Sequence, residues 1–237
     1  MSFCVNSGKC MEKVVVSLGG SVLVPGEDDA RFLAELASLL REVSKHVRLF
    51  VVTGGGRIAR YYIETGRTLG IAERTLDGLG IEATRLNARL LAAALKGAAN
   101  PTPASTYSEA ARLSKRWSIV LMGGTGPGHT TDRVSVSLAR SVRASRIVNA
   151  TSVDGVYDAD PKKDPHARML ESITFRDLVD LAGGGRWSAG PSVVFDPVAA
   201  KLLARARIPL AVVRGRDLTA VRHAILGLPF HGTSVSD

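Results

Sequence analysis

The part of the sequence most suited to chemistry is a set of three glycine-rich clusters, each directly after a short apolar run. The clusters read GGS at residues 19–21, GGG at residues 54–56 and GGTGPGHTTD at residues 123–132. Glycine lets backbone N–H groups approach an anion closely, and threonine hydroxyls supply further donors. One such cluster is most often only a tight turn, but three in equivalent positions predict a binding site for phosphate or another oxyanion.

The third cluster carries the densest set of donors. Its four glycines let the chain wrap an anion, and its hydroxyl donors are Thr125, Thr130 and Thr131. Asp132 begins a helix-like segment, where its carboxylate could hold a metal or orient a cation, whereas His129 has no carboxylate partner nearby in the sequence to make it a general base. None of the clusters has the GxxxxGK[ST] or GxGxxG pattern, which argues against P-loop NTPases and ordinary dinucleotide-binding dehydrogenases.

The elements that must position these clusters alternate along the chain. Continuous apolar runs predict buried strands at residues 14–18, 49–52, 119–122, 147–149 and 210–213. Apolar residues at helical spacing predict helices at residues 30–47, 79–95, 197–206 and 218–226, the third of them opened by Asp196 and Pro197. The predicted fold class is a three-layer α/β/α sandwich with a central, mainly parallel sheet. Since ligands bind beyond the carboxyl ends of parallel strands, the clusters should face one crevice.

Length and composition predict one globular domain. The chain has 237 residues, of which 45% are hydrophobic, and we expect a single domain at residues 11–237 after a flexible leader at residues 1–10. Cys4 and Cys10 both lie in that leader; we favour two free thiols, with a disulfide as the alternative. No apolar run approaches the roughly 18 residues that cross a bilayer, so we expect a cytoplasmic protein without a membrane partner.

The net charge of +9 fits a solvated basic surface, nucleic-acid binding or a small anionic substrate. Basic residues are spread singly along the chain and are locally dense only at residues 112–116 and 162–163. Aromatic residues do not interleave with them as a base-stacking platform would require. We therefore favour a solvated surface, then a phosphorylated substrate, and expect no nucleic-acid partner.

Six motifs occur in an order that resembles a known family. They read LGGSVL, VVTGGGRIAR, GLGIEATRLNARLL, MGGTGPGHTTD, ATSVDGVYDADPKKDP and FDPVAAKLLARARI. Together they are similar to the uridylate kinases of the amino acid kinase superfamily, in their archaeal branch, from Met11 to Gly232 and Thr233. The resemblance implies an amino acid kinase-like fold, transfer of the γ-phosphoryl group of ATP to UMP in pyrimidine nucleotide biosynthesis, a requirement for Mg²⁺, and a homohexamer.

The resemblance also implies a UMP-binding amino-terminal lobe and an ATP-binding carboxyl-terminal lobe. The matching positions on the UMP side are Gly55, Asp77, Thr125, Gly126, Pro127, Gly128, His129, Thr130 and Thr131. The matching positions on the ATP side are Gly20, Ser21, Gly56, Arg60, Thr151, Tyr157 and Asp160. The reaction needs alignment and charge neutralisation rather than a base, because the attacking phosphate oxygen of UMP is already anionic.

One departure from the family pattern affects the chemistry. Many members have a lysine two residues before the first glycine, where this chain has Ser17. The positive charge must then come from elsewhere. Our hypothesis is that Arg57 and Lys163 supply it, with Asp132 organising the cations, and we expect no metal site made by protein ligands.

Two other functions remain open at this point. One is a different kinase of the same superfamily, acting on acetylglutamate, aspartate, carbamate or isopentenyl phosphate; the GPGHTT loop favours a nucleotide instead. The other is a basic protein that binds nucleic acid or oxyanions without catalysis, which the high pI and Ser17 would suit. The residues do not separate UMP from CMP as the acceptor.

Overall fold

A central sheet organises the chain. The computed structural model describes residues 11–159, 161, 164–183 and 195–237, and these form a seven-stranded sheet in the order β3-β2-β1-β4-β8-β9-β7. Its strands are β1 (Lys13–Leu18), β2 (Arg48–Thr53), β3 (Ile119–Met122), β4 (Arg146–Thr151), β7 (Ser172–Ile173), β8 (Leu210–Arg214) and β9 (Thr233–Val235). Every neighbouring pair is parallel except β8 with β9. The predicted mainly parallel sheet is therefore confirmed.

The five predicted strands form the block β3-β2-β1-β4-β8, close to their predicted boundaries. Successive residues of β1 point to opposite faces, so that Val14 and Val16 belong to one hydrophobic cluster and Val15 to another. All three are at most 2% exposed. Burying an aliphatic side chain contributes about 1.5–3 kcal/mol, and a continuous apolar run gains this on both faces.

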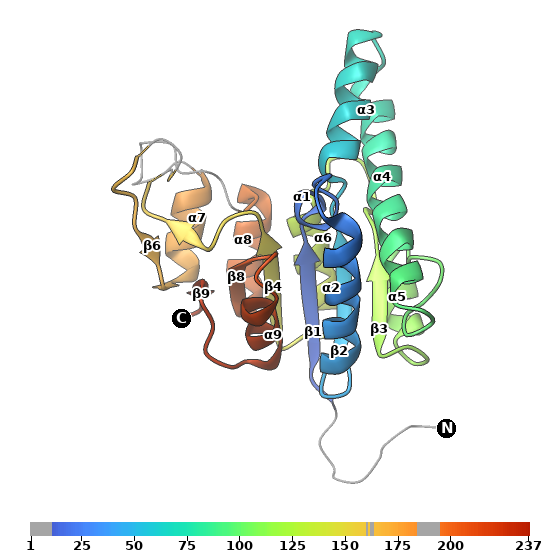
Figure 1. The fold of residues 1–237 in the computed structure, drawn as a ribbon. Helices are drawn as coiled ribbons and strands as arrows, with labels where there is room; N and C mark the ends of the chain where they lie inside the picture. The colour runs from blue at the N-terminus through green and yellow to red at the C-terminus, as the bar shows by residue number, and fades with distance from the viewer. Residues whose placement is uncertain (1–10, 160, 162–163, 184–194) are drawn as a thin grey trace.

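Helices cover both faces of the sheet (Figure 1). One layer contains α2 (Asp29–Val43), α9 (Leu218–Leu226) and the carboxyl-terminal part of α4 (Glu73–Ala94). The opposite layer contains α5 (Tyr107–Leu113), α6 (Thr131–Val142), α7 (Phe175–Gly183) and α8 (Pro197–Ala206). This is the predicted three-layer sandwich. The carboxylate of Asp196 caps α8 by accepting from Ala199 N at 2.8 Å, as its position before Pro197 predicts.

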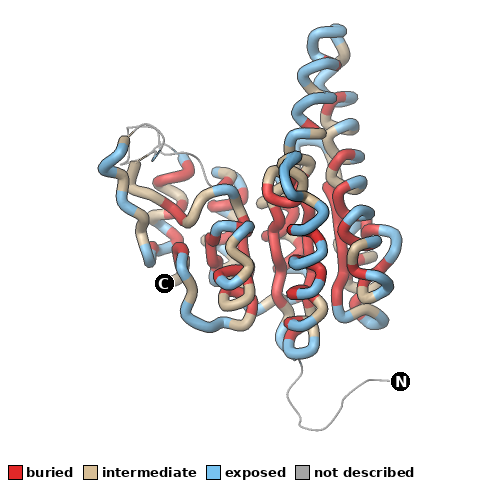
Figure 2. The backbone as a smooth tube through the Cα atoms, viewed as in Figure 1, coloured by how far each residue is buried: buried red, intermediate tan, exposed pale blue. Residues whose placement is uncertain are grey.

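The helix α3 (Gly56–Thr68) pairs with α4 in a hairpin that projects beyond the carboxyl edge of the sheet (Figures 1 and 2). The prediction began α4 six residues late and did not include α3. Three leucines of the predicted apolar stripe lie outside the core: Leu79 is 37% exposed, Leu86 57% and Leu90 45%. Helical spacing identifies an apolar face, but it does not say what covers that face.

The remaining elements are short. The helix α1 (Gly20–Leu23) follows β1, and the segment after β4 contains the hairpin β5 (Val156–Tyr157) with β6 (Met169–Leu170). The predicted leader at residues 1–10, with both cysteines, lies outside the described residues. Within the described ranges, no helix has the length and apolar character that a membrane span requires.

Candidate active site

The three glycine clusters meet at the carboxyl edge of the sheet, as predicted. The first and second are in backbone contact, because a Cβ added at Gly20 would lie 2.2 Å from Gly56 N and 2.6 Å from Gly54 O. A Cβ at Gly54 would lie 3.2 Å from Thr131 Oγ1, which brings in the third cluster. Real Cβ atoms do not approach other atoms this closely at Gly20, so the contact requires glycine there.

The backbone of the second cluster is shaped for an anion. Gly55 has right-handed helical angles, with φ −81° and ψ −27°, and Gly56 follows with φ +60°. Successive residues of opposite hand turn their N–H groups toward a common concavity, which suits an oxyanion. Gly56 is also the first residue of α3, so the positive end of that helix dipole adds to the attraction.

The third cluster is held by a carboxylate from α4. Asp77 Oδ2 accepts from Gly128 N at 2.9 Å, although the two residues are 51 positions apart. Within the loop, Thr125 Oγ1 lies 3.1 Å from His129 Nδ1. The structure therefore brings Asp77 together with the loop at residues 125–131, and it pairs His129 with a hydroxyl rather than with a carboxylate.

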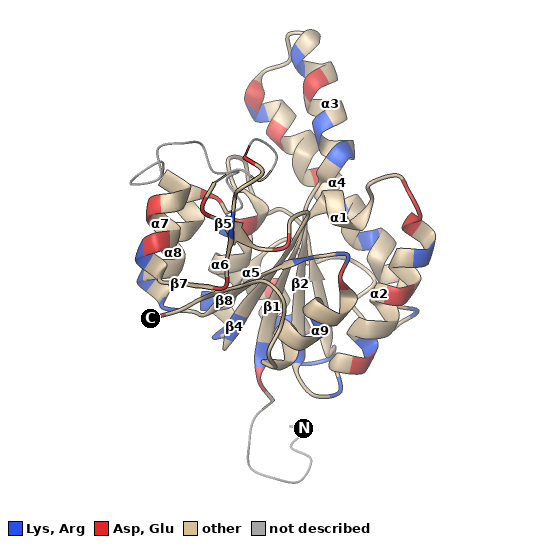
Figure 3. Cartoon of the chain, turned by 60° about the vertical axis from the view of Figure 1, so that its left-hand side comes forward, with Lys and Arg blue, Asp and Glu red and all other residues tan. Residues whose placement is uncertain are grey.

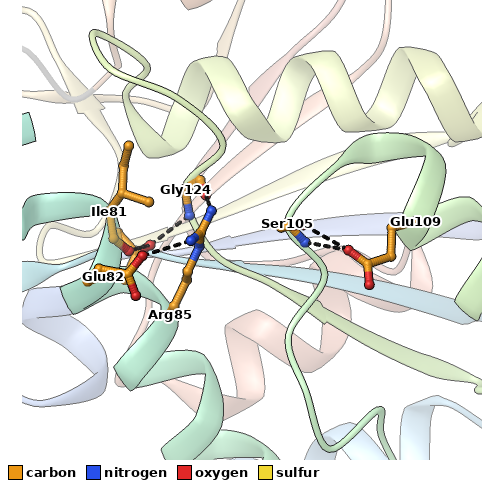
Figure 4. A network of polar contacts seen from close by, with 7 residues as sticks. Ile81, Glu82, Arg85, Ser105, Glu109 and Gly124 are labelled. Carbon is orange, nitrogen blue, oxygen red and sulfur yellow. Dashed lines mark hydrogen bonds and ion pairs between the residues drawn. The ribbon is translucent and has the colours of Figure 1, made fainter. Parts of the chain in front are cut away.

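Two polar residues of α4 that the sequence analysis did not single out hold the third cluster from behind. Thr84 Oγ1 accepts from Gly124 N at 2.6 Å and donates to Ile81 O at 2.6 Å. Arg85 Nη2 donates to Gly124 O at 3.4 Å, and Arg85 Nη1 pairs with Glu82 at 2.7 Å (Figure 4).

Asn87, also on α4, holds the second cluster. Its Nδ2 donates to Gly54 O at 2.8 Å and to Gly55 O at 3.3 Å. Asn87 is only 1% exposed. The motif GLGIEATRLNARLL could have indicated this role, because it places the amide of Asn87 on the same helix as an apolar stripe. A polar side chain that is buried normally has a hydrogen-bond partner.

Asp132 lies at the centre of the edge, in the first turn of α6. Its Oδ1 is 3.4 Å from Ser17 Oγ, and its Oδ2 accepts from Asp196 N at 3.1 Å. The pKa of Asp132 is raised to about 6, mainly by burial; the nearby charge of Asp196 also raises it, and the hydrogen bonds from Asp196 N and Ser17 oppose the rise. Where many family members have a lysine, this carboxylate thus meets the neutral Ser17.

The arginines predicted for the site come from α3, and both are exposed. Arg60 Nη2 donates to Ser21 Oγ at 3.4 Å, so these two predicted residues are neighbours. The Arg57 guanidinium lies against Gly26, where an added Cβ would be 2.4 Å from Nη2. Lys163, the other predicted cation, lies outside the described residues.

A second polar group sits where β4 and β8 end. Thr151 pairs in register with Arg214, and Gly215 N donates to Thr151 O at 2.7 Å. Asp154 Oδ2 accepts from Arg214 Nη2 at 3.1 Å and from the Tyr157 hydroxyl at 3.3 Å. The hydrogen bonds from Arg214 hold the pKa of Asp154 below its ordinary value.

The sequence analysis had assigned Thr151, Tyr157 and Asp160 to this region. The structure adds Asp154 and Arg214, whereas Asp160 lies outside the described residues. The pairing of Asp154 with Arg214 joins residues 60 positions apart, and no local pattern indicates it.

The sandwich, with its three glycine-rich strand ends in one crevice, is the arrangement of an amino acid kinase. Residues 12–214 match the model of the amino acid kinase family, and the chain belongs to this family.

Within this family, the chain is similar to proteins named uridylate kinase. The chain is 48% identical to the uridylate kinase of Methanoculleus marisnigri over 227 residues, which cover 96% of this chain and 97% of the relative. It is 43% identical to the uridylate kinase of Thermoplasma volcanium, covering 95% and 98% of the two chains. The crystal structure of uridylate kinase from Archaeoglobus fulgidus superimposes with a TM-score of 0.85 at 40% identity, over 95% of this chain and all of that one. The UMP kinase of Bacillus anthracis, with a TM-score of 0.80 at 23% identity, shares the fold.

Proposed function

We propose that this chain is a UMP kinase, which transfers the γ-phosphoryl group of ATP to UMP and yields UDP and ADP for pyrimidine nucleotide synthesis. The observation that carries the proposal is the meeting of three glycine clusters at one edge of the sheet, in a chain 48% identical over nearly its full length to a relative named uridylate kinase. The same comparison favours this activity over acetylglutamate, aspartate, carbamate or isopentenyl phosphate kinase.

In this proposal UMP binds in the amino-terminal lobe. Gly55, Asp77 and the loop at residues 125–131 contact it, and the Asp77 carboxylate accepts a hydrogen bond from the ribose. ATP binds in the carboxyl-terminal lobe, across the ends of β4 and β8. Its phosphates lie on Gly20, Ser21, Gly56 and Arg60, and its base and ribose lie beside Thr151, Tyr157 and Asp160. The contact between Gly20 and Gly56 supports a shared phosphate site.

The chemical step forms a bond between a UMP phosphate oxygen and the γ-phosphorus, and it breaks the bond from that phosphorus to the oxygen bridging the β-phosphate. The nucleophile is already anionic, so the protein supplies alignment and positive potential rather than a base. Backbone N–H groups at Gly55 and Gly56 are suited to this role, because they carry partial positive charge and are fixed before the substrate arrives. We propose that Asp132 orients the cations that complete the site.

Mg²⁺ is part of the proposal through the nucleotide. The described residues contain no group of three or more His, Cys, Asp and Glu side chains that could hold a metal by themselves. Mg²⁺ is commonly bound by one or two carboxylates together with substrate phosphates. Asp132, at the centre of the carboxyl edge of the sheet, is the carboxylate that would bind Mg²⁺ together with the phosphates. When bound, Mg²⁺ neutralises phosphate charge.

We propose that Arg57 and Lys163 together supply the positive charge that a lysine at the position of Ser17 would provide. Its place in the first turn of α3, next to Gly56, supports the proposal. We expect Arg57→Ala to lower kcat/KM by more than about 10-fold, which is about 1.4 kcal/mol of barrier, and Arg57→Lys to restore part of it. A kcat/KM for Arg57→Ala within about twofold of wild type would rule Arg57 out.

The activity itself is tested by ADP release from Mg-ATP with a panel of acceptors. The panel contains UMP, CMP, dUMP, AMP, acetylglutamate, aspartate, carbamate and isopentenyl phosphate. Turnover with UMP alone supports the proposal, and turnover with another acceptor alone replaces it with that kinase. No turnover with any acceptor, together with salt-dependent binding of oligonucleotides, would favour the non-catalytic alternative. Figure 3 shows both acidic and basic residues on α2 and on the α3–α4 hairpin.

We also propose a homohexamer in the cytoplasm, where its nucleotide substrates are. Exposed apolar side chains on the α3–α4 hairpin support an assembly: Tyr61 is 66% exposed, Leu69 71% and Leu86 57%. Large exposed apolar groups of this kind are typical of protein interfaces. Sedimentation of the chain as a monomer at micromolar concentration would exclude the hexamer.

A further inference from the structure

The side-chain amide of Asn87 makes an unusual pair of contacts. One nitrogen atom, Nδ2, donates its two hydrogens to the carbonyls of two consecutive residues, at 2.8 Å to Gly54 O and 3.3 Å to Gly55 O. The residue is 1% exposed, so these bonds form out of contact with solvent. Asn87 therefore holds both carbonyls from the side of α4, the helix that carries it, while Gly55 O also accepts from Ala59 N of α3 at 3.3 Å.

The planar geometry of the peptide bond then determines where the N–H groups of Gly55 and Gly56 point. All peptide bonds in the described residues are trans. In a planar trans peptide the C=O of one residue and the N–H of the next point in opposite directions. A donor that holds Gly54 O and Gly55 O from the α4 side therefore points the N–H groups of Gly55 and Gly56 away from α4.

These two N–H groups are the ones that form the anion-binding concavity of the second cluster. Among the described residues neither of them donates a hydrogen bond to the protein. A buried or half-buried N–H group normally has a partner, so these two groups are available to a ligand or to solvent. Gly20 lies against this loop, because a Cβ added there would be 2.2 Å from Gly56 N and 2.6 Å from Gly54 O, so the first cluster borders the same space.

We propose that Asn87 is a positioning residue for phosphoryl transfer: by holding two carbonyls from behind, it aims the Gly55 and Gly56 N–H groups at a substrate phosphate. This inference rests on the proposed function for the identity of the substrate. Asn87 itself does not touch the substrate. Only a side chain with two donor hydrogens on one atom, at this length, can hold both carbonyls at once.

The test removes one or both donor hydrogens of Asn87. Asn87→Asp is isosteric, but a carboxylate has no donor and repels both carbonyl oxygens. Asn87→Ser is smaller and uncharged, and it retains one donor. Asn100→Asp is the matched control, because Asn100 is also 1% exposed and its Nδ2 holds two backbone carbonyls, Thr102 O at 2.8 Å and Leu121 O at 3.0 Å.

Three quantities are measured on the full chain: the melting temperature, kcat and KM for UMP and ATP, and the affinity for inorganic tripolyphosphate by calorimetry. We expect Asn87→Asp to lose about 10-fold or more in both kcat/KM and tripolyphosphate affinity at temperatures where it is folded, with a smaller loss for Asn87→Ser. We expect Asn100→Asp to melt at a lower temperature with kcat/KM within about twofold of wild type.

Unchanged kcat/KM and unchanged tripolyphosphate affinity in a folded Asn87 variant would overturn the proposal. It would also be overturned if both Asn87 variants failed to fold, since Asn87 would then be a structural residue alone. If the wild-type chain has no activity with UMP, the proposed function fails, but the tripolyphosphate affinities still decide the role of Asn87.

Discussion

Replacing Asp132 by asparagine should make the protein more stable at neutral pH. The carboxylate is partly removed from solvent, it accepts only from Ser17 and Asp196 N among the described residues, and its pKa rises from 3.8 to about 6. Asparagine has the same shape and satisfies the same neighbours: its oxygen accepts from Asp196 N, and its amide donates to Ser17 Oγ, since a hydroxyl can also accept.

The magnitude follows from the shift in pKa. A rise from 3.8 to about 6 is about two pKa units, which is about 3 kcal/mol against the ionised form in the folded chain. Residual solvent exposure of the side chain screens part of this, so we expect Asp132→Asn to gain about 1–3 kcal/mol at pH 7.5. For a chain of this length the gain corresponds to about 2–10 °C in melting temperature.

The dependence on pH has a definite sign. Because the folded-state pKa is the higher one, the folded chain holds a proton between pH 3.8 and about 6 that the unfolded chain has released. Wild-type stability relative to Asp132→Asn is therefore greatest below pH 3.8 and falls as the pH rises through 6. Comparing the two proteins at each pH cancels the titration of all other groups.

The assay is urea unfolding of both proteins between pH 4 and 8. The advantage of Asp132→Asn should be largest at pH 7.5 and should approach zero near pH 4. A difference that does not change over this range, or a variant less stable than wild type at pH 7.5, would refute the reasoning. We also expect the variant to lose kinase activity, as is common where a site keeps a destabilising charge for function.

Two further substitutions test the crevice. Gly20→Ala places a Cβ 2.2 Å from Gly56 N and should lower the free energy of unfolding by about 1–3 kcal/mol. Gly78→Ala is the control, because nothing lies within 4 Å of a Cβ there, and it should not destabilise the protein. Equal urea midpoints for the two variants would contradict the close contact at Gly20. Arg214→Ala removes the partner of Asp154 and should raise the KM for ATP several-fold while the KM for UMP stays constant. Arg222→Ala, which breaks an ion pair between α9 and α2, is its control, and a change in both KM values for Arg214→Ala would exclude a role confined to the ATP side.

Local patterns account for most of the predicted fold. Continuous apolar runs predicted the five central strands, because a strand buried on both faces needs apolar residues at every position. Asp196 before Pro197 predicted the start of α8, since a cap depends only on neighbours three residues apart. Helix α3 was missed because it contains two glycines, which lower helix propensity, and because only Ala59 and Gly66 of it are buried.

The location of the candidate site could also be predicted from residue types. Three glycine clusters after three apolar runs predicted one binding edge, because the carboxyl ends of parallel strands lie side by side. Asp77 and the third cluster were assigned to the same ligand, and the structure places them 2.9 Å apart. The assignments of individual residues to UMP or ATP remain predictions that the proposed assays test.

By itself, the sequence therefore determined the sandwich, its glycine-lined edge and the family, because these depend on residue type and short-range spacing. Tertiary structure decided which side chains serve that edge. Asn87 meets Gly54 across 33 positions and Ser17 meets Asp132 across 115, contacts that depend on how α4 and α6 pack beside the sheet. It also decided that Leu79, Leu86 and Leu90 lie outside the core, since an apolar stripe is the same in sequence whether a sheet or another surface covers it.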